Sequence, residues 1–583
     1  MTQGSRKRAL PRGKYSKWKP KQRRKEMTKK FNSLAVAALI TLSVLSISIA
    51  PAGAQPGIST NGVLLEEWRF DMHWYCWGYY GSSPAIADLG VNNHGSEPDS
   101  DLEIVTGSDE SWGPDSSYGV WRTFDSGGNL EWQKGTQTDE ARSSPVIVDL
   151  DVDGDLEIAG GTTSGWYFEV MDHQSNFVWT FPKLTGFQVG GPFVWPSSPA
   201  AADLDPDESG LELVIGNRWL GNVWAFDGDN SDGTDSGITI GPGDFPWAYS
   251  LGTEGTDWDV LWKFPTTGSI GEGFATPAIG DVDNDGVLEV VIGAADGNVY
   301  VLNGIDGSLE HTFYTGDSVH ASVALANLDA DACIEMIIGS TDNNVYCLQW
   351  DGTTGSTEWT FLTGGAVYSS AAVGDVDGDG SLEIVIGSND GNVYSLSTSG
   401  SVEWSYATGG AVYSSPALAD RCVGKYDMDW PMFRHDVRRT GYYGAAPLTG
   451  LDIYVGSDDC YLYLLDGSDG SMIDRFQTYS SGYCDGIHTS PSIADVDGDN
   501  KLEIFFYDWG QGSVHGGHTF WALEDTGSGP CNEPPDVSEA NPSIDCLWPP
   551  NHKFVDITIE GVTDPDGDAV TITITGITSD EPT

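Results

Sequence analysis

The chain has 583 residues and a formal net charge of −58, with 28 lysines and arginines against 86 aspartates and glutamates. This charge excludes proteins that bind nucleic acid or anionic lipid through a basic surface, because both ligands carry dense negative charge. The length and the 74 glycines favour an array of turn-rich β repeats over long helices.

The N-terminus has the organisation of a secretory signal. Residues 6–30 carry thirteen basic residues, and the apolar stretch 34–50 follows them. A small-residue cleavage pattern ends at Ala54. We therefore expect residues 1–54 to be a signal peptide and the mature protein to be secreted, either extracellular or at the cell surface.

Two alternatives concern this segment. An uncleaved membrane anchor is one, because the apolar stretch nearly spans a bilayer. Met27 would be a more usual start for a signal peptide, which would leave residues 1–26 untranslated. After cleavage, the sequence contains no other stretch long and apolar enough to span a membrane.

A small-residue segment recurs eight times along the chain. Its first copy is SSPAIAD at residues 82–88, and three later copies begin at residues 321, 369 and 414. The spacing matches a four-stranded propeller blade, which needs about 40–50 residues. Each copy reads as four short strands between Gly-, Asn- and Asp-rich turns.

The fourth strands decide the number of blades. Seven copies end in such a strand, for example residues 401–406, whereas the eighth copy ends at residue 525 without one. Residues 64–70 carry the missing pattern upstream of the first copy. An N-terminal strand that completes the last blade closes the ring and leaves no open sheet edge. We predict an all-β, eight-bladed propeller over residues 62–525, with seven blades as the alternative.

Tryptophans recur in the fourth strands with the period of the repeat, so we assign them to the structure. They are Trp68, Trp132, Trp179, Trp262, Trp359 and Trp404.

Four copies carry aspartates at positions 1, 3 and 5, and a glutamate at position 9, between their first and second strands. Oxygens alternating along a tight turn in this way converge on one point, as in sites that hold Ca²⁺. The predicted ligands are Asp149, Asp151, Asp153, Asp155 and Glu157; Asp281, Asp283, Asp285, Val287 and Glu289; Asp375, Asp377, Asp379, Ser381 and Glu383; and Asp495, Asp497, Asp499, Lys501 and Glu503.

Two further loops depart from this pattern. One keeps Asn327, Asp329, Asp331 and Glu335 but replaces the turn glycine with Ala332. The other has Asp203, Asp205 and Asp207, which reach Glu212 only with one extra residue. A plain Asp-rich turn is the alternative for a single loop. Counting the weaker loops, we expect about four to six Ca²⁺ ions.

The segment FATPAIGDVDNDGVLEVVIGAADGNVYVL (274–302) resembles the FG-GAP/VCBS repeat of integrin-α-type propellers. The resemblance covers about residues 82–525 and implies calcium-binding loops between the first two strands of each repeat. This chain has Glu at the ninth position, where the family more often has Asp. Residues 296–313 and 429–441 are similar, more loosely, to PQQ-like propeller repeats, which implies the same fold.

Aromatic residues gather in connections that the strand order places opposite the acidic loops. These residues are His73, Trp74, Trp77, Tyr79, Tyr80, Trp112, Trp195, Trp219, Trp509 and His515. We predict that they form a recognition patch over blades 8, 1, 2 and 3, because aromatic platforms suit sugar rings and protein side chains. The alternative is that they cover the ring and pack on one another.

The C-terminal part differs in composition from the repeats. Residues 526–553 are Pro-rich and read as a linker. Residues 554–583 alternate apolar and polar residues around a DPDGD turn, and they resemble part of a bacterial Ig-like or cadherin-like module. Asp564, Asp566 and Asp568 of this turn are candidate Ca²⁺ ligands, with a plain turn as the alternative.

The eight cysteines fit an oxidising compartment. Cys531 and Cys546 lie close together in the Pro-rich segment and are the predicted disulfide pair. Cys76 and Cys484 precede equivalent strands and are a weaker second pair.

These features favour a calcium-binding propeller that acts as a binding or adhesion module for an extracellular protein or carbohydrate. An enzyme on the same fold is the alternative, either a polysaccharide lyase or hydrolase or a PQQ-type dehydrogenase. A structural surface-layer protein is the third alternative. The sequence has no H-E-x-x-H, no G-x-S-x-G and no adjacent cysteines, so it gives catalysis little support.

Overall fold

The structure is a computed structural model. It describes residues 57–71, 82–90, 102–109, 119–136, 141, 143–162, 168–181, 197–206, 210–217, 221–228, 258–265, 275–329, 331–423, 450–478, 486–509, 519–530, 541–542, 559–560 and 562. All of them belong to the compact unit Gly53–Thr583. The expected signal, residues 1–54, lies outside them. Within the described ranges there is no helix that could span a membrane.

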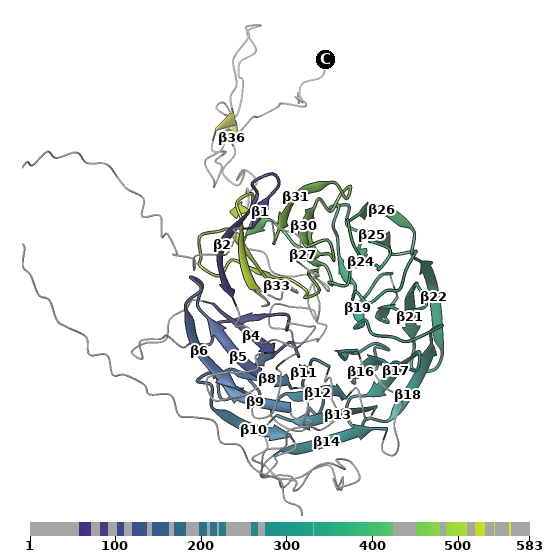
Figure 1. Cartoon of the computed structure of the whole chain (residues 1–583). Helices are drawn as coiled ribbons and strands as arrows, with labels where there is room; N and C mark the ends of the chain where they lie inside the picture. Colours follow the sequence, from purple (N-terminus) through teal and green to yellow (C-terminus); the bar gives the residue numbers. More distant parts are fainter. Residues whose placement is uncertain are drawn as a thin grey trace, which may run out of the picture. The chain divides into compact units, whose positions relative to one another are not determined.

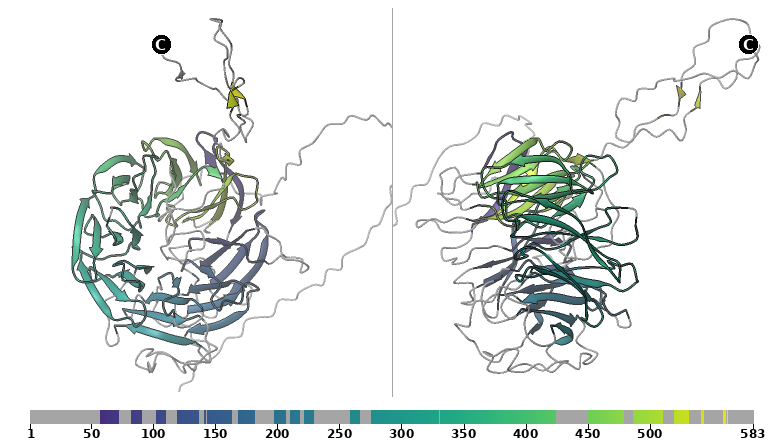
Figure 2. Two further views of the ribbon diagram at one scale, coloured as in Figure 1. Left: turned by 180° about the vertical axis from the view of Figure 1, so that it is seen from behind. Right: turned by 90° about the vertical axis from the view of Figure 1, so that its right-hand side faces the viewer.

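Eight four-stranded antiparallel units stand around a common axis (Figure 1), which confirms the predicted fold. We number these blades in chain order and name the strands of each blade a to d, in the order of the repeat. Figure 2 shows the same ring from behind and from the side.

The strand bounds of blades 1 to 4 are as follows. Blade 1 has β3 (Ala85–Ala87), β4 (Glu103–Asp109), β5 (Gly119–Phe124) and β6 (Leu130–Gly135). Blade 2 has β7 (Val146–Val148), β8 (Glu157–Gly161), β9 (Phe168–Asp172) and β10 (Phe177–Phe181). Blade 3 has β11 (Ala200–Ala202), β12 (Glu212–Asn217), β13 (Asn222–Asp227) and β14 (Asp259–Phe264). Blade 4 has β15 (Ala278–Gly280), β16 (Glu289–Gly293), β17 (Asn298–Asn303) and β18 (Leu309–Tyr314).

The strand bounds of blades 5 to 8 complete the ring. Blade 5 has β19 (Ala324–Ala326), β20 (Glu335–Gly339), β21 (Asn344–Trp350) and β22 (Gly355–Leu362). Blade 6 has β23 (Ala372–Gly374), β24 (Glu383–Gly387), β25 (Asn392–Ser397) and β26 (Val402–Ala407). Blade 7 has β27 (Ala417–Ala419), β29 (Asp452–Gly456), β30 (Tyr461–Leu465) and β31 (Met472–Gln477). Blade 8 has β32 (Ser492–Ala494), β33 (Leu502–Asp508), β34 (Thr519–Asp525) and β2 (Leu64–Asp71).

The N-terminal strand closes the ring, as the sequence predicts. β2 is strand d of blade 8 and pairs antiparallel with β34, with Leu64 opposite Asp525 and Asp71 opposite Thr519. The alternative of seven blades is therefore wrong. Residues from the two ends of the propeller share one sheet, so the N-terminal strand completes blade 8.

A closed circle of hydroxyl groups joins the small-residue segments around the axis. In each blade a backbone N–H at the start of strand a donates to a Ser or Thr hydroxyl of the next blade, over 2.8 to 3.3 Å. The residues in order are Ser83, Ser144, Ser198, Thr276, Ser322, Ser370, Ser415 and Ser490, and the last N–H returns to the hydroxyl of Ser83. The recurring SSP segment thus places a donor and an acceptor where the blades converge.

Hydrophobic side chains fill the space between adjacent blades, and this packing also crosses the closure. Ile86 and Phe124 of blade 1 share a buried cluster with Phe505 of blade 8. The strand-d tryptophans bind the next blade as well. Trp68 of blade 8 donates from Nε1 to the carbonyl of Ser126 at 2.9 Å, and Trp359 of blade 5 donates to Thr398 at 2.8 Å. These contacts support the structural role assigned to the recurring tryptophans.

The remaining described strands are short. β1 (Ile58–Ser59) adds to the outer edge of blade 7 beside β31. β28 (Cys422–Val423) pairs parallel with β35 (Gly529–Pro530). β36 (Asn541–Pro542), in the segment predicted as a linker, pairs antiparallel with β37 (Ile559–Glu560) of the expected C-terminal module.

Candidate metal centres

The acidic loops connect strands a and b, and strand pairing brings the two ends of each loop together. In blade 4, Gly280 at the end of β15 pairs with Glu289 at the start of β16. The corresponding pairs in blades 2, 6 and 8 are Val148 with Glu157, Gly374 with Glu383, and Ala494 with Glu503. The ninth-position glutamate therefore lies next to the first aspartate of its own loop.

Five loops bring carboxylate oxygens of three residues within 4.8 Å of one another. The groups are Asp149, Asp151 and Glu157; Asp281, Asp283 and Asp285; Asp329, Asp331 and Glu335; Asp375, Asp377 and Glu383; and Asp495, Asp497 and Glu503. They comprise the four regular loops and the loop of blade 5, where Ala332 replaces the glycine. Each of these acidic groups could hold a metal ion.

In the four regular loops, the backbone holds the first aspartate in place. In blade 6, Asp375 accepts the N–H of Asp379 on Oδ1 at 3.1 Å and the N–H of Gly380 on Oδ2 at 2.9 Å. Gly380 has a φ of +91°, a conformation that glycine adopts without steric cost. Asp281 accepts the equivalent two bonds in blade 4. Part of the repulsion between the carboxylates is thus offset within the loop.

The ninth-position glutamate is buried, with one oxygen bound to the backbone. Glu289 Oε2 accepts the N–H of Val282 at 2.8 Å, and Glu383 Oε2 accepts that of Val376 at 2.9 Å. Glu289 is 0% exposed, and its Oε1 is buried without a hydrogen-bond donor. A buried carboxylate oxygen without a donor is costly unless a proton or a cation neutralises it. This set of oxygen donors fits a hard cation such as Ca²⁺.

Burial raises the pKa of the ninth-position glutamate in each of the five loops. The pKa is about 7 for Glu157 and Glu335, about 8 for Glu383, and about 9 for Glu289 and Glu503. The negative charges of the loop aspartates raise it further, whereas the hydrogen bond from the backbone N–H acts in the opposite direction. A bound cation would also lower these pKa values, because it favours the ionised carboxylate.

Strand d adds carboxylates that the sequence analysis missed. Burial and then the charges of Asp497, Glu524 and Asp499 raise the pKa of Glu67 to about 7. Its Oε2 is buried without a hydrogen-bond donor. Glu403 of blade 6 likewise has a raised pKa, because of burial and then the loop aspartates. The feature of the sequence that could have revealed these carboxylates is a glutamate directly before the strand-d tryptophan, as at Trp68, Trp359 and Trp404.

The described residues of blades 1 and 3 form no such group. In blade 3, Glu212 Oε2 accepts the N–H groups of Leu204 and Asp205, and burial raises the pKa of Glu212 to about 7. Asp203 lies at the start of the loop, but Asp207 lies outside the described residues. Residues 91–101 of the blade 1 loop also lie outside them.

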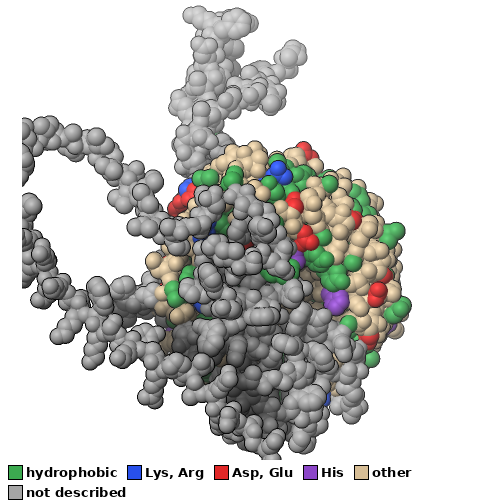
Figure 3. Space-filling model, viewed as in Figure 1, with side chains coloured by type: hydrophobic (Ala, Val, Ile, Leu, Met, Phe, Trp, Pro, Cys, Tyr) green, Lys and Arg blue, Asp and Glu red, His purple; other side chains and the backbone are tan. Residues whose placement is uncertain are grey.

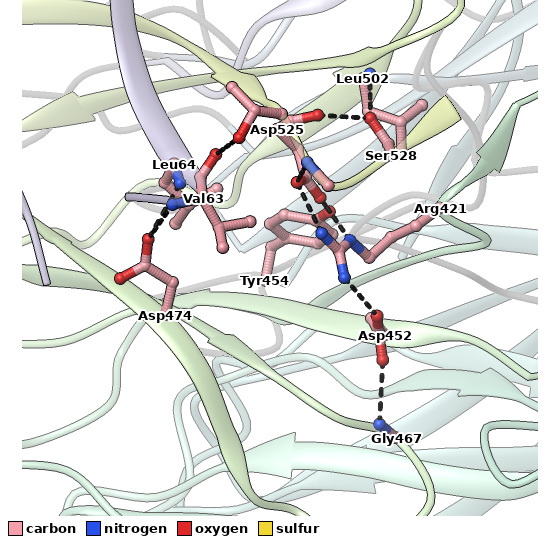
Figure 4. A network of polar contacts seen from close by, with 12 residues as sticks. Val63, Leu64, Arg421, Asp452, Tyr454, Gly467, Asp474, Leu502, Asp525 and Ser528 are labelled. Atoms are coloured by element: carbon pink, nitrogen blue, oxygen red, sulfur yellow. Dashed lines mark hydrogen bonds and ion pairs between the residues drawn. The ribbon is translucent and has the colours of Figure 1, made fainter. Parts of the chain in front are cut away.

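In blade 7, an arginine follows strand a where the other blades have an apolar residue. Arg421 donates from Nε to Asp525 Oδ2 at 2.6 Å and from Nη2 to Asp525 Oδ1 at 2.8 Å (Figure 4). Its Nη1 lies 3.7 Å from Oδ2 of Asp452, which occupies the place of the ninth-position glutamate at the start of β29. Tyr454 donates its hydroxyl to Asp525 as well. A guanidinium thus neutralises carboxylates in this blade.

Of the predicted aromatic patch, the structure describes Trp509. The backbone N–H of Trp509 donates to the carbonyl of Gly486 at 2.8 Å, and its ring contacts His488. The other predicted patch residues, His73, Trp74, Trp77, Tyr79, Tyr80, Trp112, Trp195, Trp219 and His515, lie outside the described residues. The same holds for Asp564, Asp566, Asp568, Cys531 and Cys546. Cys460 is disulfide-bonded, whereas Cys333 and Cys347 are free thiols.

Comparison with known proteins relates one part of the chain to a family. A family model described as the lambda-carrageenase beta-propeller domain matches residues 352–420, which include all of blade 6. None of the curated proteins matches the chain.

The solved structures that match the chain include three from different sources. Sqt1 from Saccharomyces cerevisiae is 12% identical with a TM-score of 0.46, covering 78% of this chain and 97% of that one. BamB from Moraxella catarrhalis is 14% identical with a TM-score of 0.42, covering 76% and 96%. The computationally designed Ika8 protein is 16% identical with a TM-score of 0.42, covering 76% and 97%. At such identities these similarities say nothing about function.

Proposed function

We propose that the chain is a secreted β-propeller that binds Ca²⁺ in its a–b loops and acts as a binding module for a polysaccharide. The observation that carries the proposal is the convergence of carboxylate oxygens within 4.8 Å in five loops. All members of these groups are Asp or Glu, and hard oxygen donors favour Ca²⁺ over metals that prefer imidazole or thiolate. The signal pattern of residues 1–54 supports secretion.

The loop spacing supports assignment to the FG-GAP/VCBS type of propeller. The DPDGD turn supports an Ig-like or cadherin-like C-terminal segment. Both assignments belong to the proposal.

A polysaccharide is the favoured partner because of the match over residues 352–420. The name of the matching family says that its member acts on carrageenan, a polysaccharide. An extracellular protein is the alternative partner. The acidic surface disfavours nucleic acid.

The same match favours a second candidate function, a polysaccharide-cleaving enzyme. A propeller fold is compatible with either role, so only the reaction products can separate binding from catalysis.

The test uses the mature chain, residues 55–583, on a panel of polysaccharides that includes λ-carrageenan. Retention is measured by affinity electrophoresis with millimolar calcium and with chelator, and new reducing ends are measured in the same samples. We expect calcium-dependent retention without new reducing ends. Release of reducing ends would establish the enzyme instead. Failure to retain any polysaccharide would contradict the proposal, and an array of extracellular proteins would then test the alternative partner.

A further inference from the structure

Five aromatic or imidazole side chains form a continuous line across blades 5 to 8. The ring centroids are 5.4 Å apart between His320 and Tyr368, and 5.4 Å apart between Tyr368 and Tyr413. Tyr413 lies 4.9 Å from His488, which lies 5.4 Å from Trp509. We call these five residues the aromatic arc.

The hydroxyl circle sets the spacing of the arc. Four of its members lie two positions before the hydroxyl residue that joins their blade to its neighbours; these hydroxyl residues are Ser322, Ser370, Ser415 and Ser490. Because the circle holds the inner ends of the blades at fixed positions, the side chains just before it meet at ring-contact distance. Trp509 joins them from the b–c connection of blade 8, held by its backbone bond to Gly486.

The arc is partly exposed and lies away from the acidic loops. Tyr368 is 37% exposed, and the other four members are half-buried. Strands alternate in direction, so the d–a and b–c connections that carry the arc lie on the face opposite the a–b loops. On the described part of the face in Figure 3, histidine side chains lie beside hydrophobic ones.

We propose that the aromatic arc is a binding site for an uncharged carbohydrate chain, with sugar rings lying on Tyr368 and Tyr413. The inference rests on the proposed polysaccharide-binding function and names its site. Tyrosine offers a flat, rigid apolar face to the C–H groups of a sugar, together with a hydroxyl for hydrogen bonding. His488 Nε2 lies 2.5 Å from Asp458 Oδ1, and this polar pair can bind sugar hydroxyls at the end of the line.

Two observations favour a neutral sugar over other ligands. The carboxylate of Asp458 beside the arc, with its side chain 32% exposed, disfavours anionic sugars. Among the described residues, the exposed large aliphatic side chains lie in strands, in an a–b loop or in a c–d turn, and none lies in a d–a connection. A protein-binding surface would instead need an apolar core around its aromatic residues.

The experiment compares the wild-type mature chain with Tyr368→Ala, Tyr413→Ala and the double variant. The probes are galactomannan, xyloglucan and laminarin as neutral chains, and alginate and λ-carrageenan as anionic chains, all in calcium. We expect retention of a neutral probe, weakened about tenfold by each substitution and more by the double variant. Tyr368→Phe keeps the ring and should keep most of the affinity. Tyr314→Ala removes a tyrosine that is 72% exposed on β18, outside the arc, and should change nothing.

Melting temperatures show whether each variant is folded. The Tyr368→Ala variant alone is sufficient to test the arc, because the ring of Tyr368 is the most exposed of the five. Unchanged affinity in a folded Tyr368→Ala, Tyr413→Ala double variant would overturn the arc while leaving polysaccharide binding by the chain intact. Retention of anionic probes alone would overturn the neutral-sugar assignment. Failure of the wild type to retain any probe, or binding to an extracellular protein instead, would overturn the proposed function as well.

Discussion

Arg421 and Asp525 form a two-pronged ion pair between the last two blades of the propeller. Nε lies 2.6 Å from Oδ2, and Nη2 lies 2.8 Å from Oδ1. Asp525 is 0% exposed and ends β34, directly opposite Leu64 of the closing strand. A guanidinium is always charged and fits a carboxylate with two parallel bonds. In blade 7 a side chain therefore provides the positive charge that we propose Ca²⁺ provides in other blades.

Replacing Arg421 by Met should destabilise the propeller by about 3–5 kcal/mol, because the carboxylate of Asp525 would stay buried without its counter-charge. Urea denaturation followed by tryptophan fluorescence measures the loss. Adding Asp525→Asn removes the isolated charge and should recover part of it. A single variant that unfolds at the urea concentration of the wild type would show that the pair does not stabilise the closure.

Asp474 of blade 7 anchors the N-terminal segment before the closing strand. Its Oδ1 accepts the N–H groups of Thr60 and Asn61, and its Oδ2 accepts those of Val63 and Leu64, over 2.7 to 3.0 Å. Burial alone would raise the pKa of Asp474, but hydrogen bonds from the Ser59 hydroxyl and from the backbone N–H groups of Leu64, Asn61 and Arg475 hold the pKa below its ordinary value.

We expect Asp474→Asn to cost about 2 kcal/mol, because the amide NH₂ cannot accept hydrogen bonds from the backbone. Thermal melting at neutral pH measures the change. Asp469→Asn, on an exposed turn of the same blade, is the control and should melt like the wild type. If the two variants melt alike, the anchor contributes no stability.

Gly400 lies where a side chain would collide with the tryptophan of the preceding blade. Its φ is +74°, and a Cβ atom would lie 2.6 Å from Trp359 Cδ2. Gly400→Ala should therefore cost more than the roughly 1 kcal/mol expected for an unfavourable φ alone. Gly62→Ala isolates that smaller cost, because Gly62 has a φ of +81° and open space around it. Equal losses of stability in the two variants would show that the ring of Trp359 can move aside without an energetic cost.

The ninth-position glutamates predict a pH dependence that calcium should reduce. The pKa of Glu289 and of Glu503 is about 9 in the folded chain, against an ordinary value of 4.5, chiefly because of burial. A raised folded pKa gives stability that is complete below the unfolded pKa and is lost as the pH rises through the folded value.

In chelator, the melting temperature should therefore fall between about pH 5 and pH 9. In saturating calcium the fall should be smaller, because the ion replaces the proton on these carboxylates. A melting temperature that rises over this range in chelator would contradict the assignment.

The blades and the acidic loops could be predicted because their signals are local and repeat. Strand d of blade 6 was expected at residues 401–406, and β26 is Val402–Ala407. The closing strand followed from counting fourth strands, since a ring has to pair its last edge.

The strand-d glutamates and the aromatic arc could not be predicted in this way. The electrostatic interaction of Glu67 with the blade 8 loop depends on a strand that arrives from the other end of the chain. Tyr368 and Tyr413 belong to short connections that carry one aromatic residue each, and only the hydroxyl circle makes them neighbours. The bulky connections that the sequence makes conspicuous, such as residues 71–81, lie mostly outside the described residues.

Calcium titration of the mature, chelator-treated chain by calorimetry, with elemental analysis of the saturated protein, shows whether the a–b loops hold Ca²⁺. We expect about four to six Ca²⁺ ions per chain and a higher melting temperature when they are bound. A chain that binds no calcium at millimolar supply, with the same melting temperature in calcium and in chelator, would contradict this expectation.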